Sequence, residues 1–225
     1  MDVTYRTPAG IEAESMRIIG EELAGLGLAI PAEREAVVKR VIHTTADFDY
    51  AVNLRFTEGA VQRAVAAFQA GASVVTDTNM AKAGVSKAAL AKLGGQVHCF
   101  MADPEVAAAA KARGDTRAVV CMEKAAREHP GAVLAVGNAP TALLKLCELM
   151  EVGLRPALVV GAPVGFVNVV ESKERIFEVC ERYAVPCVAA MGRKGGSNVA
   201  AAICNALLYT ALDAVDPALR GEKLT

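Results

Sequence analysis

The chain has 225 residues, of which 53% are hydrophobic and 22% charged, and its formal net charge at pH 7 is −1. This composition excludes a disordered chain and provides enough apolar residues for a sizeable core. Without tryptophan, with 4% aromatic residues and almost no net charge, the chain lacks the features typical of nucleic-acid-binding proteins and of proteins drawn to acidic membranes.

Helical spacing of apolar residues predicts three helices in the first third of the chain, over residues 7–24, 31–46 and 58–70. Gly71 directly follows the third pattern, in the position where glycine commonly ends a helix. No strand pattern interrupts these three segments. We therefore expect the N-terminal part of the chain to be helical.

After residue 71, short valine-rich runs alternate with helical patterns. The predicted strands are 73–76, 96–101, 132–136, 157–160 and 185–191, and the predicted helices are 104–113, 116–128, 139–150, 166–182 and 198–212. Strands that are apolar throughout and alternate with helices are typical of a parallel sheet covered on both faces. We predict an α/β fold, a three-layer α/β/α arrangement with a mainly parallel sheet of about five strands, preceded by N-terminal helices.

No linker or internal repeat divides the sequence, which favours a single domain over residues 1–225 with a loose C-terminal tail at 213–225. Residues 1–11 lack the apolar core of a signal peptide. The six cysteines form no C-x-x-C pair and sit in apolar stretches, which favours reduced thiols in a cytoplasmic protein over disulfides. The longest uncharged run, 195–212, contains four polar residues and fits a buried helix better than a membrane span.

Unusual loops follow four of the predicted strands, at 77–80, 137–141, 161–166 and 192–197, and the last three contain glycine. Ligands of parallel sheets bind beyond the carboxyl ends of the strands, and helix N-termini there favour anions. Any one loop could simply be a turn, but together with Arg193 and Lys194 they indicate an anion-tolerant rim. Arg117 starts a predicted helix and is either a further carboxylate clamp or an ordinary surface residue.

His43 is the leading candidate for proton chemistry, because imidazole titrates near neutral pH. Arg40 precedes it by three residues and shares its helix face, where it could hold an anionic ligand. Asp47 could raise the pKa of His43 if it faces the ring, whereas Asp49 fits a solvated helix end. His98 fits a core position and His129 a solvated loop, and no spacing typical of a metal site is present.

Five segments, in this order, resemble the precorrin-8X methylmutase (precorrin isomerase) family. They are VIHTTADF at 41–48, DTNM at 77–80, GNAPTAL at 137–143, GAPVGFV at 161–167 with ESK at 171–173, and GRKGGS at 192–197. The resemblance extends over about residues 11–211. It implies the α/β fold predicted above and a homodimer with sites near the subunit interface.

The resemblance also implies a 1,5-sigmatropic shift in cobalamin biosynthesis, which moves a methyl group from C-11 to C-12 of a corrin precursor to give cobyrinate or hydrogenobyrinate. His43 matches the family's proton donor and acceptor, and Ser15 and Arg40 match its substrate contacts. The HTTADF form is similar to the anaerobic branch, which implies cobalt-precorrin-8 as substrate, with cobalt carried by the substrate and no protein cofactor or metal. The other predicted substrate-binding residues are Thr44, Asp77, Met80, Arg117, Gly137, Asn138, Gly195, Gly196 and Ser197.

Two alternatives stay open. A non-catalytic corrinoid carrier could use the same rim and would differ from the isomerase in having no need of His43. A nucleotide-dependent α/β enzyme has less support, because neither a P-loop nor a G-x-G-x-x-G pattern is present. We expect a corrinoid as the partner, and neither nucleic acid nor a membrane.

Overall fold

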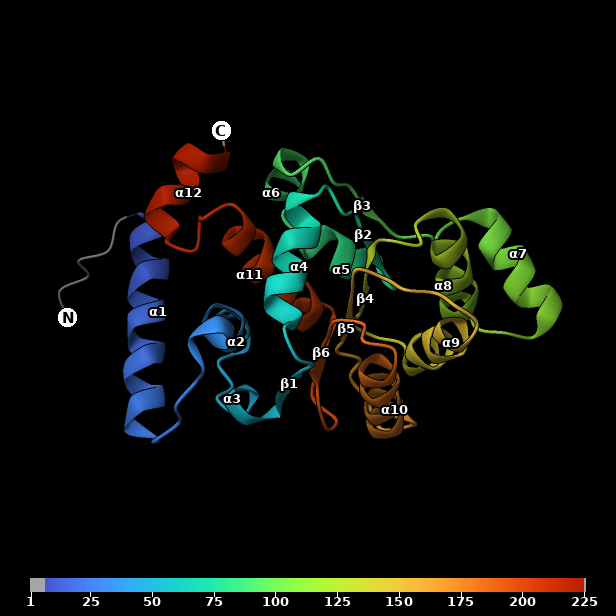
Figure 1. The fold of residues 1–225 in the computed structure, drawn as a ribbon, viewed down its shortest axis with the longest axis horizontal. Helices are drawn as coiled ribbons and strands as arrows, with labels where there is room; N and C mark the ends of the chain where they lie inside the picture. Colours follow the sequence, from blue (N-terminus) through green and yellow to red (C-terminus); the bar gives the residue numbers. More distant parts are fainter. Residues whose placement is uncertain (1–6, 225) are drawn as a thin grey trace.

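A computed structural model describes residues 7–224 and shows one sheet between two layers of helices (Figure 1). Residues 1–6 and Thr225 lie outside the described part. The predictions for residues 1–11 and for the tail at 213–225 therefore fall partly outside it. The described strands are β1 (Leu54–Phe56), β2 (Val74–Thr76), β3 (Val97–His98), β4 (Val133–Val136), β5 (Leu158–Gly161) and β6 (Cys187–Ala190).

The sheet has the order β1-β6-β5-β4-β2-β3, and every neighbouring pair is parallel except β1 with β6. All residues of β4, β5 and β6 are buried, because helices cover both faces of these apolar strands. This confirms the three-layer prediction and its five strands. The sixth strand, β1, was not predicted, because three residues with an exposed arginine at the centre form no apolar run.

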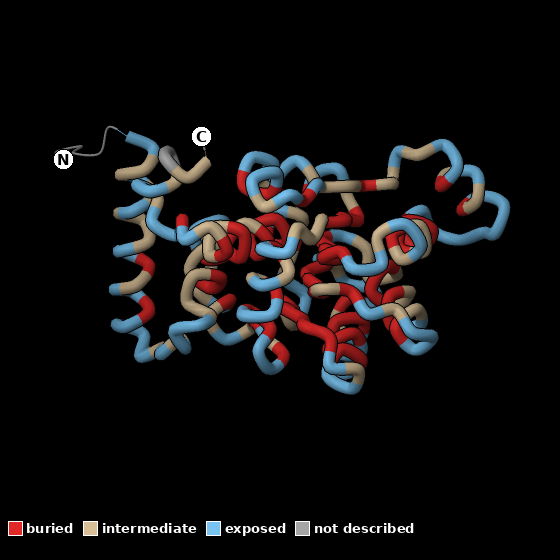
Figure 2. Tube along the Cα trace, turned by 45° about the horizontal axis from the view of Figure 1, so that its top comes forward, coloured by how far each residue is buried: buried red, intermediate tan, exposed pale blue. Residues whose placement is uncertain are grey.

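The helices form two groups, one on each face of the sheet. The described helices are α1 (Pro8–Gly25), α2 (Ala32–Thr45), α3 (Tyr50–Asn53), α4 (Ala60–Gln69), α5 (Asn79–Gly84), α6 (Lys87–Lys92), α7 (Pro104–Arg113), α8 (Arg117–Glu128), α9 (Pro140–Glu151), α10 (Val169–Arg182), α11 (Ser197–Ala211) and α12 (Pro217–Leu224). One apolar cluster joins α1, α2, α4 and α11 to the sheet, and a second joins α7 to α10 to the opposite face. Figure 2 shows the buried segments concentrated at the strands and the helices next to them.

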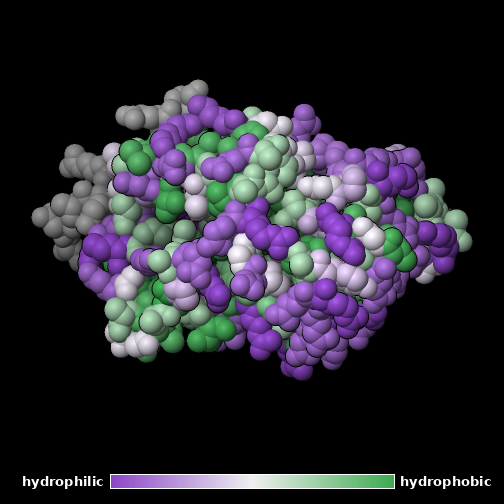
Figure 3. Space-filling model, in the orientation of Figure 1, coloured by the Kyte–Doolittle hydropathy of each residue, from purple (hydrophilic) through white to green (hydrophobic). Residues whose placement is uncertain are grey.

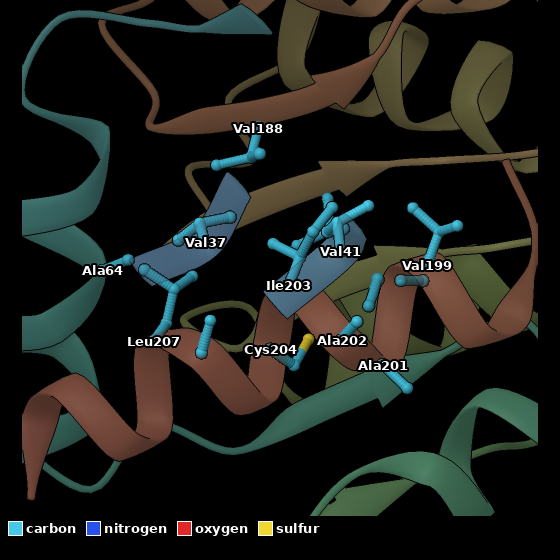
Figure 4. Packing of buried hydrophobic residues seen from close by; sticks show 14 of the residues in the cluster. Val37, Val41, Ala64, Val188, Val199, Ala201, Ala202, Ile203, Cys204 and Leu207 are labelled. Carbon is cyan, nitrogen blue, oxygen red and sulfur yellow. The ribbon is translucent and has the colours of Figure 1, made fainter. Parts of the chain in front are cut away.

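Helix α11 lies between α2 and the sheet and is buried along most of its length, as predicted for the uncharged run. Figure 4 shows Ile203 and Leu207 of α11 facing Val37 and Val41 of α2, with Val188 of β6 nearby. Both α2 valines are 0% exposed, and burying a side chain of this size stabilises the fold by about 1.5–3 kcal/mol. This packing fixes the position of α2, the helix that carries His43.

The expected loose tail at 213–225 is wrong for most of its length, because residues 217–224 form α12. The Asp216 carboxylate accepts a hydrogen bond from the N–H of Ala218 at 2.9 Å, which caps the helix start. Arg220 then joins α12 to Glu12 on α1. A helix of eight residues, held by the bonds of Arg220 and by the packing of Leu224, is too short to show a periodic apolar signal, and the sequence therefore did not reveal it.

Two further expectations change with the structure. His98 was expected in the core and His129 in a solvated loop. Both are instead half-buried, and their rings stack with centroids 4.3 Å apart. All six cysteines are buried, as expected for small core residues. Within residues 7–224, none of the helices combines the length and apolar character needed to span a bilayer.

Candidate active site

His43 lies in the last turn of α2. The helix ends at Ala46, whose left-handed backbone (φ 53°) breaks the spiral and whose N–H donates to the carbonyl of Ile42 at 2.7 Å. The buried residues of α2 are Val37, Val38, Val41 and Ile42. His43 lies away from this stripe and is exposed, so a ligand can reach the imidazole.

A carboxylate on α1, Glu12, joins two arginines beside this histidine. Arg40 Nη2 lies 2.5 Å from Glu12 Oε1, and Arg220 Nη1 lies 2.6 and 2.7 Å from the two carboxylate oxygens. Both guanidinium groups also lie over the ring of Tyr209, 5.4 and 4.1 Å from its centroid. We call Glu12, Arg40, Tyr209 and Arg220 the arginine cluster. The sequence suggested only Arg40, because no motif spacing links residues 12, 209 and 220.

These surroundings lower the pKa of His43 below its ordinary value of about 6.5. Partial loss of hydration is the largest cause, and the charge of Arg40 adds to it. The Glu12 carboxylate acts in the opposite direction, and Arg220 has the smallest effect, again lowering the pKa. At pH 7 the free protein therefore holds His43 mainly as neutral imidazole.

The two aspartates after His43 bind a lysine. Lys194 Nζ lies 2.7 Å from Asp47 Oδ2 and 2.6 Å from Asp49 Oδ2. The hydrogen bond from Lys194 lowers the pKa of Asp47. The sequence left open that Asp47 faces His43 and raises its pKa. This is not the case, since the pKa of His43 is lowered and the causes are burial and the charges of Arg40, Glu12 and Arg220. Instead, the pair ties the end of α2 to the loop between β6 and α11.

Asp77 is buried at the carboxyl end of β2 and supports the neighbouring loop. Its carboxylate accepts three backbone hydrogen bonds of 2.8 Å, from Gly137, Asn138 and Ala139. Burial raises the pKa of Asp77, and these three bonds offset part of the rise. Asp77 is 1% exposed and both of its carboxylate oxygens accept backbone hydrogen bonds, so the structure gives its side chain a supporting role, while its predicted contact with substrate stays a prediction.

The loops after β2, β4 and β6 meet at one edge of the sheet, as predicted. A Cβ atom on Gly137 would lie 2.7 Å from the Cα of Ser197, so only glycine allows these two loops to pack this closely. The Ser197 hydroxyl lies 2.8 Å from that of Thr78 at the start of α5. Gly137 and Ser197 therefore hold the loops of the rim together.

The loop after β6 is fixed from beneath by Lys173 of α10. Figure 3 shows hydrophilic residues gathered where α10 reaches the surface, yet Lys173 lies on the buried side of this helix and is 0% exposed. Its Nζ donates to the carbonyls of Gly192 and Lys194 at 2.8 and 2.7 Å. Burial lowers the pKa of Lys173 to about 8. The same loop leaves no room for a Cβ on Gly195, which would lie 2.4 Å from the Ala162 carbonyl oxygen.

We expect Lys173→Met to loosen this loop, because two carbonyl groups lose their donor. Hydrogen exchange of the amides at 192–197 should quicken, and unfolding in urea should show a loss of about 1–3 kcal/mol. Between pH 8 and 10 the difference in free energy of unfolding between wild type and variant should grow. In this range Lys173 holds a proton in the unfolded chain but has released it in the folded protein, so folding becomes more favourable as pH rises. Lys111→Met, at an exposed position of α7, is the matched control. Unchanged exchange at 192–197 would contradict the supporting role of Lys173.

The structure places the remaining predicted residues as follows. Ser15 is half-buried on α1, one turn after Glu12, and so belongs near the arginine cluster. Thr44 is exposed beside His43, and its hydroxyl donates to the carbonyl of Arg40. Met80, Asn138 and Gly196 lie at the rim, where Met80 is 75% exposed. Arg117 is exposed and starts α8, in the helix layer opposite His43.

A groove of about 540 Å³ runs between α1, α2 and the segment before α12. Its lining residues are Ala13, Met16, Ala32, Glu35, Ala36, Lys39, Arg40, Val215, Asp216 and Pro217. Small apolar side chains therefore share one surface with two cations, Lys39 and Arg40, and two carboxylates. Lys39 Nζ lies 2.5 Å from Glu35 Oε1, so this cation already has a partner. Arg40 belongs to both the groove and the arginine cluster, and His43 follows it by less than one turn of α2.

Comparison with known proteins places the chain in a family. The family model described as precorrin-8X methylmutase matches residues 10–210. The cobalt-precorrin-8 methylmutase of Salmonella typhimurium is 44% identical over 90% of this chain and 95% of its own length, and that of Priestia megaterium is 41% identical over 89% and 87%. The crystal structure of precorrin-8x methyl mutase from Thermus thermophilus, 41% identical, superposes with a TM-score of 0.80 over 90% of this chain and 98% of the other.

These matches cover α1 to α11 and with them the helix of His43, the arginine cluster up to Tyr209 and all loops of the rim. A family model over most of the chain and relatives above 40% identity agree with each other and with the fold. The chain therefore belongs to the precorrin-8X methylmutase family, and it is an intramolecular methyl-transferring isomerase of cobalamin biosynthesis.

Proposed function

We propose that the substrate is cobalt-precorrin-8 and that the enzyme moves its methyl group from C-11 to C-12, with His43 as proton donor and acceptor. The observation that carries this proposal is an exposed imidazole less than one helical turn from Arg40, whose guanidinium group lines the groove between α1 and α2. The relatives named cobalt-precorrin-8 methylmutase support the choice of a cobalt-containing substrate over a metal-free one.

The proposed chemistry asks little of the protein beyond positioning and one proton. A sigmatropic shift breaks and forms carbon–carbon bonds within one molecule, so it consumes no oxidant or reductant, and cobalt enters as part of the substrate. A proton delivered by His43 to the macrocycle stabilises the negative charge that develops on it in the transition state. The same imidazole takes the proton back from the product. General acid catalysis of this kind contributes about 10²–10⁴-fold.

The carboxylate arms of the substrate need cations, and the groove contains Lys39 and Arg40. Each pairs with a carboxylate of the protein, Lys39 with Glu35 and Arg40 with Glu12, so a substrate carboxylate would have to replace that partner. The alanines of the groove and Met16 provide apolar area for the ring, while Ser15 offers a hydroxyl from α1. The N–H of Gly195 and the exposed side chain of Asn138 at the rim are proposed contacts for further carboxylates, as are Thr44 and Arg117. The predicted contact of Gly196 is less supported, because its N–H already donates to the Ala162 carbonyl at 2.8 Å. As part of the same proposal the enzyme works in the cytoplasm as a homodimer, whose second copy would enclose a ring larger than this groove.

The direct test is to incubate the purified protein with cobalt-precorrin-8 and follow the visible spectrum. Methyl migration changes the conjugation of the ring, so conversion should appear as a shift of the absorption bands. Metal-free precorrin-8X in a parallel reaction tests the preference for cobalt. A spectrum that stays constant with both substrates, with folded protein present, would rule out the proposed reaction.

The pH dependence should reveal the proton carried by His43. If imidazolium is the working form, kcat/KM should fall as pH rises through the pKa of the free enzyme, which lies below about 6.5. Substrate carboxylates would offset the charge of Arg40 and raise the pKa, so the fall in kcat should come at higher pH than the fall in kcat/KM. Stopped assays from pH 5 to 9 measure both. A flat profile for both constants over this range would contradict the acid role.

Arg40→Ala should mainly weaken substrate binding. A charge-assisted hydrogen bond to a carboxylate is worth about 1.5–3 kcal/mol, so KM should rise about 10- to 100-fold while kcat changes little. Arg34→Ala, on the same helix but directed at Phe56, is the matched control. An unchanged KM for Arg40→Ala would remove its role as a carboxylate ligand.

A further inference from the structure

We propose that Arg220 of α12 is a positioning residue for substrate binding, because it holds Glu12 and thereby frees Arg40 to exchange that carboxylate for one on the substrate. This inference rests on the proposed function, in which Arg40 binds a substrate carboxylate. It assigns a role to a position outside residues 10–210, the part that the family model matches.

The geometry shows one carboxylate shared by two guanidinium groups. Arg40 reaches one oxygen of Glu12, whereas Arg220 lies within 2.7 Å of both. Arg220 also donates to the carbonyls of Ala214 and Val215, at 3.0 and 2.9 Å. The guanidinium group of Arg220 is therefore held by the backbone as well as by Glu12, and Arg40 is the more easily released partner.

The net charge of the arginine cluster favours binding of an anion. One carboxylate and two guanidinium groups leave an excess positive charge on a half-buried surface, which favours an incoming anion. Both arginine side chains are 12% exposed and the Glu12 side chain is 21% exposed, so an unpaired charge here would be poorly hydrated. When Arg40 turns to a substrate carboxylate, Glu12 keeps its bonds to Arg220 and no carboxylate is left without a partner.

The cluster also reaches His43. The charged groups that act on the imidazole come from three elements: Glu12 from α1, Arg40 from α2 and Arg220 from α12. Because both cations lower the pKa of His43, removing one of them is expected to raise this pKa even without substrate. This provides a readout that does not depend on the proposed reaction.

The experiment compares Arg220→Gln, Glu12→Gln and the double variant by steady-state kinetics with cobalt-precorrin-8. In Arg220→Gln, Arg40 is the remaining partner of Glu12 and stays bound to it, so it is less available to a substrate carboxylate. KM should therefore rise about tenfold while kcat stays within about twofold. In the double variant nothing competes for Arg40, and KM should return to within about twofold of wild type. Lys223→Gln, which removes another cation of α12, is the matched control.

The outcomes separate the alternatives. If Arg220 only anchors α12, adding Glu12→Gln cannot restore KM, and a double variant as impaired as Arg220→Gln overturns the proposal. An unchanged KM in Arg220→Gln overturns it as well. NMR titration of His43 in the free protein should show a higher pKa in Arg220→Gln than in wild type, and an unchanged value would contradict the contact. Should wild type fail to convert the substrate, the proposed function fails, while this titration still tests the arrangement.

Discussion

Replacing His43 with alanine is expected to lower kcat about 10²–10⁴-fold while substrate affinity stays within a few-fold of wild type. The imidazole is exposed at the end of α2 and belongs to none of the buried residues that hold this helix, so its removal should leave the fold intact. The loss would come from the missing proton donor and not from a changed groove. Single-turnover absorbance measurements, together with a binding titration of the pigment, give the two quantities separately.

The same variant separates the isomerase from a corrinoid carrier. A carrier would bind the pigment equally well with or without His43 and would convert nothing in either form. His129→Asn serves as control, because this histidine lies at the end of α8, in the opposite helix layer. If His43→Ala turned over at close to the wild-type rate, the acid role of His43 would be wrong even though the family assignment would stand.

Asp77→Ala should have the largest effect on stability. Its carboxylate satisfies three backbone N–H groups at the start of the loop after β4, and the N–H of Gly137 lies in the buried interior. A buried donor left without an acceptor costs about 1–3 kcal/mol, and the two part-buried donors add to the loss at Gly137, so the free energy of unfolding should fall by more than about 2 kcal/mol. Urea denaturation followed by circular dichroism measures this.

Asp77→Asn sharpens the test, because the amide keeps the size of the side chain but turns one acceptor into a donor that faces N–H groups. We expect it to lose stability too. Asp115→Ala, at an exposed turn between α7 and α8, should change stability by less than about 0.5 kcal/mol. A loss below about 1 kcal/mol for both Asp77 variants would contradict the supporting role derived from these bonds.

The parallel strands and the long helices were predictable from the sequence, because both carry their signal locally. Every residue of β4 to β6 is apolar and buried, and α11 is a long run without charges. β1 and α12 were not predictable, since each is short and owes its existence to a distant partner. β1 forms against β6, and α12 is joined to α1 through Arg220.

The residues of the candidate site also differ in whether the sequence could predict them. His43 and Arg40 share one helix, so their spacing predicted that they lie together. Glu12 and Arg220 meet them only through the packing of α1 and α12, for which no local pattern exists. Asp77 was predicted at the correct edge but its supporting role was not, because the sequence does not show that backbone N–H groups from residues 137–139 bind its oxygens.

The two outermost strands decide how copies of this chain can associate. β3 is two residues long, and β1 is three residues long with the exposed Arg55 at its centre. Strands this short, one of them charged, are poor templates for continuing a sheet into a neighbouring molecule. Intermolecular strand addition and the aggregation that follows from it are therefore disfavoured at both edges of the sheet.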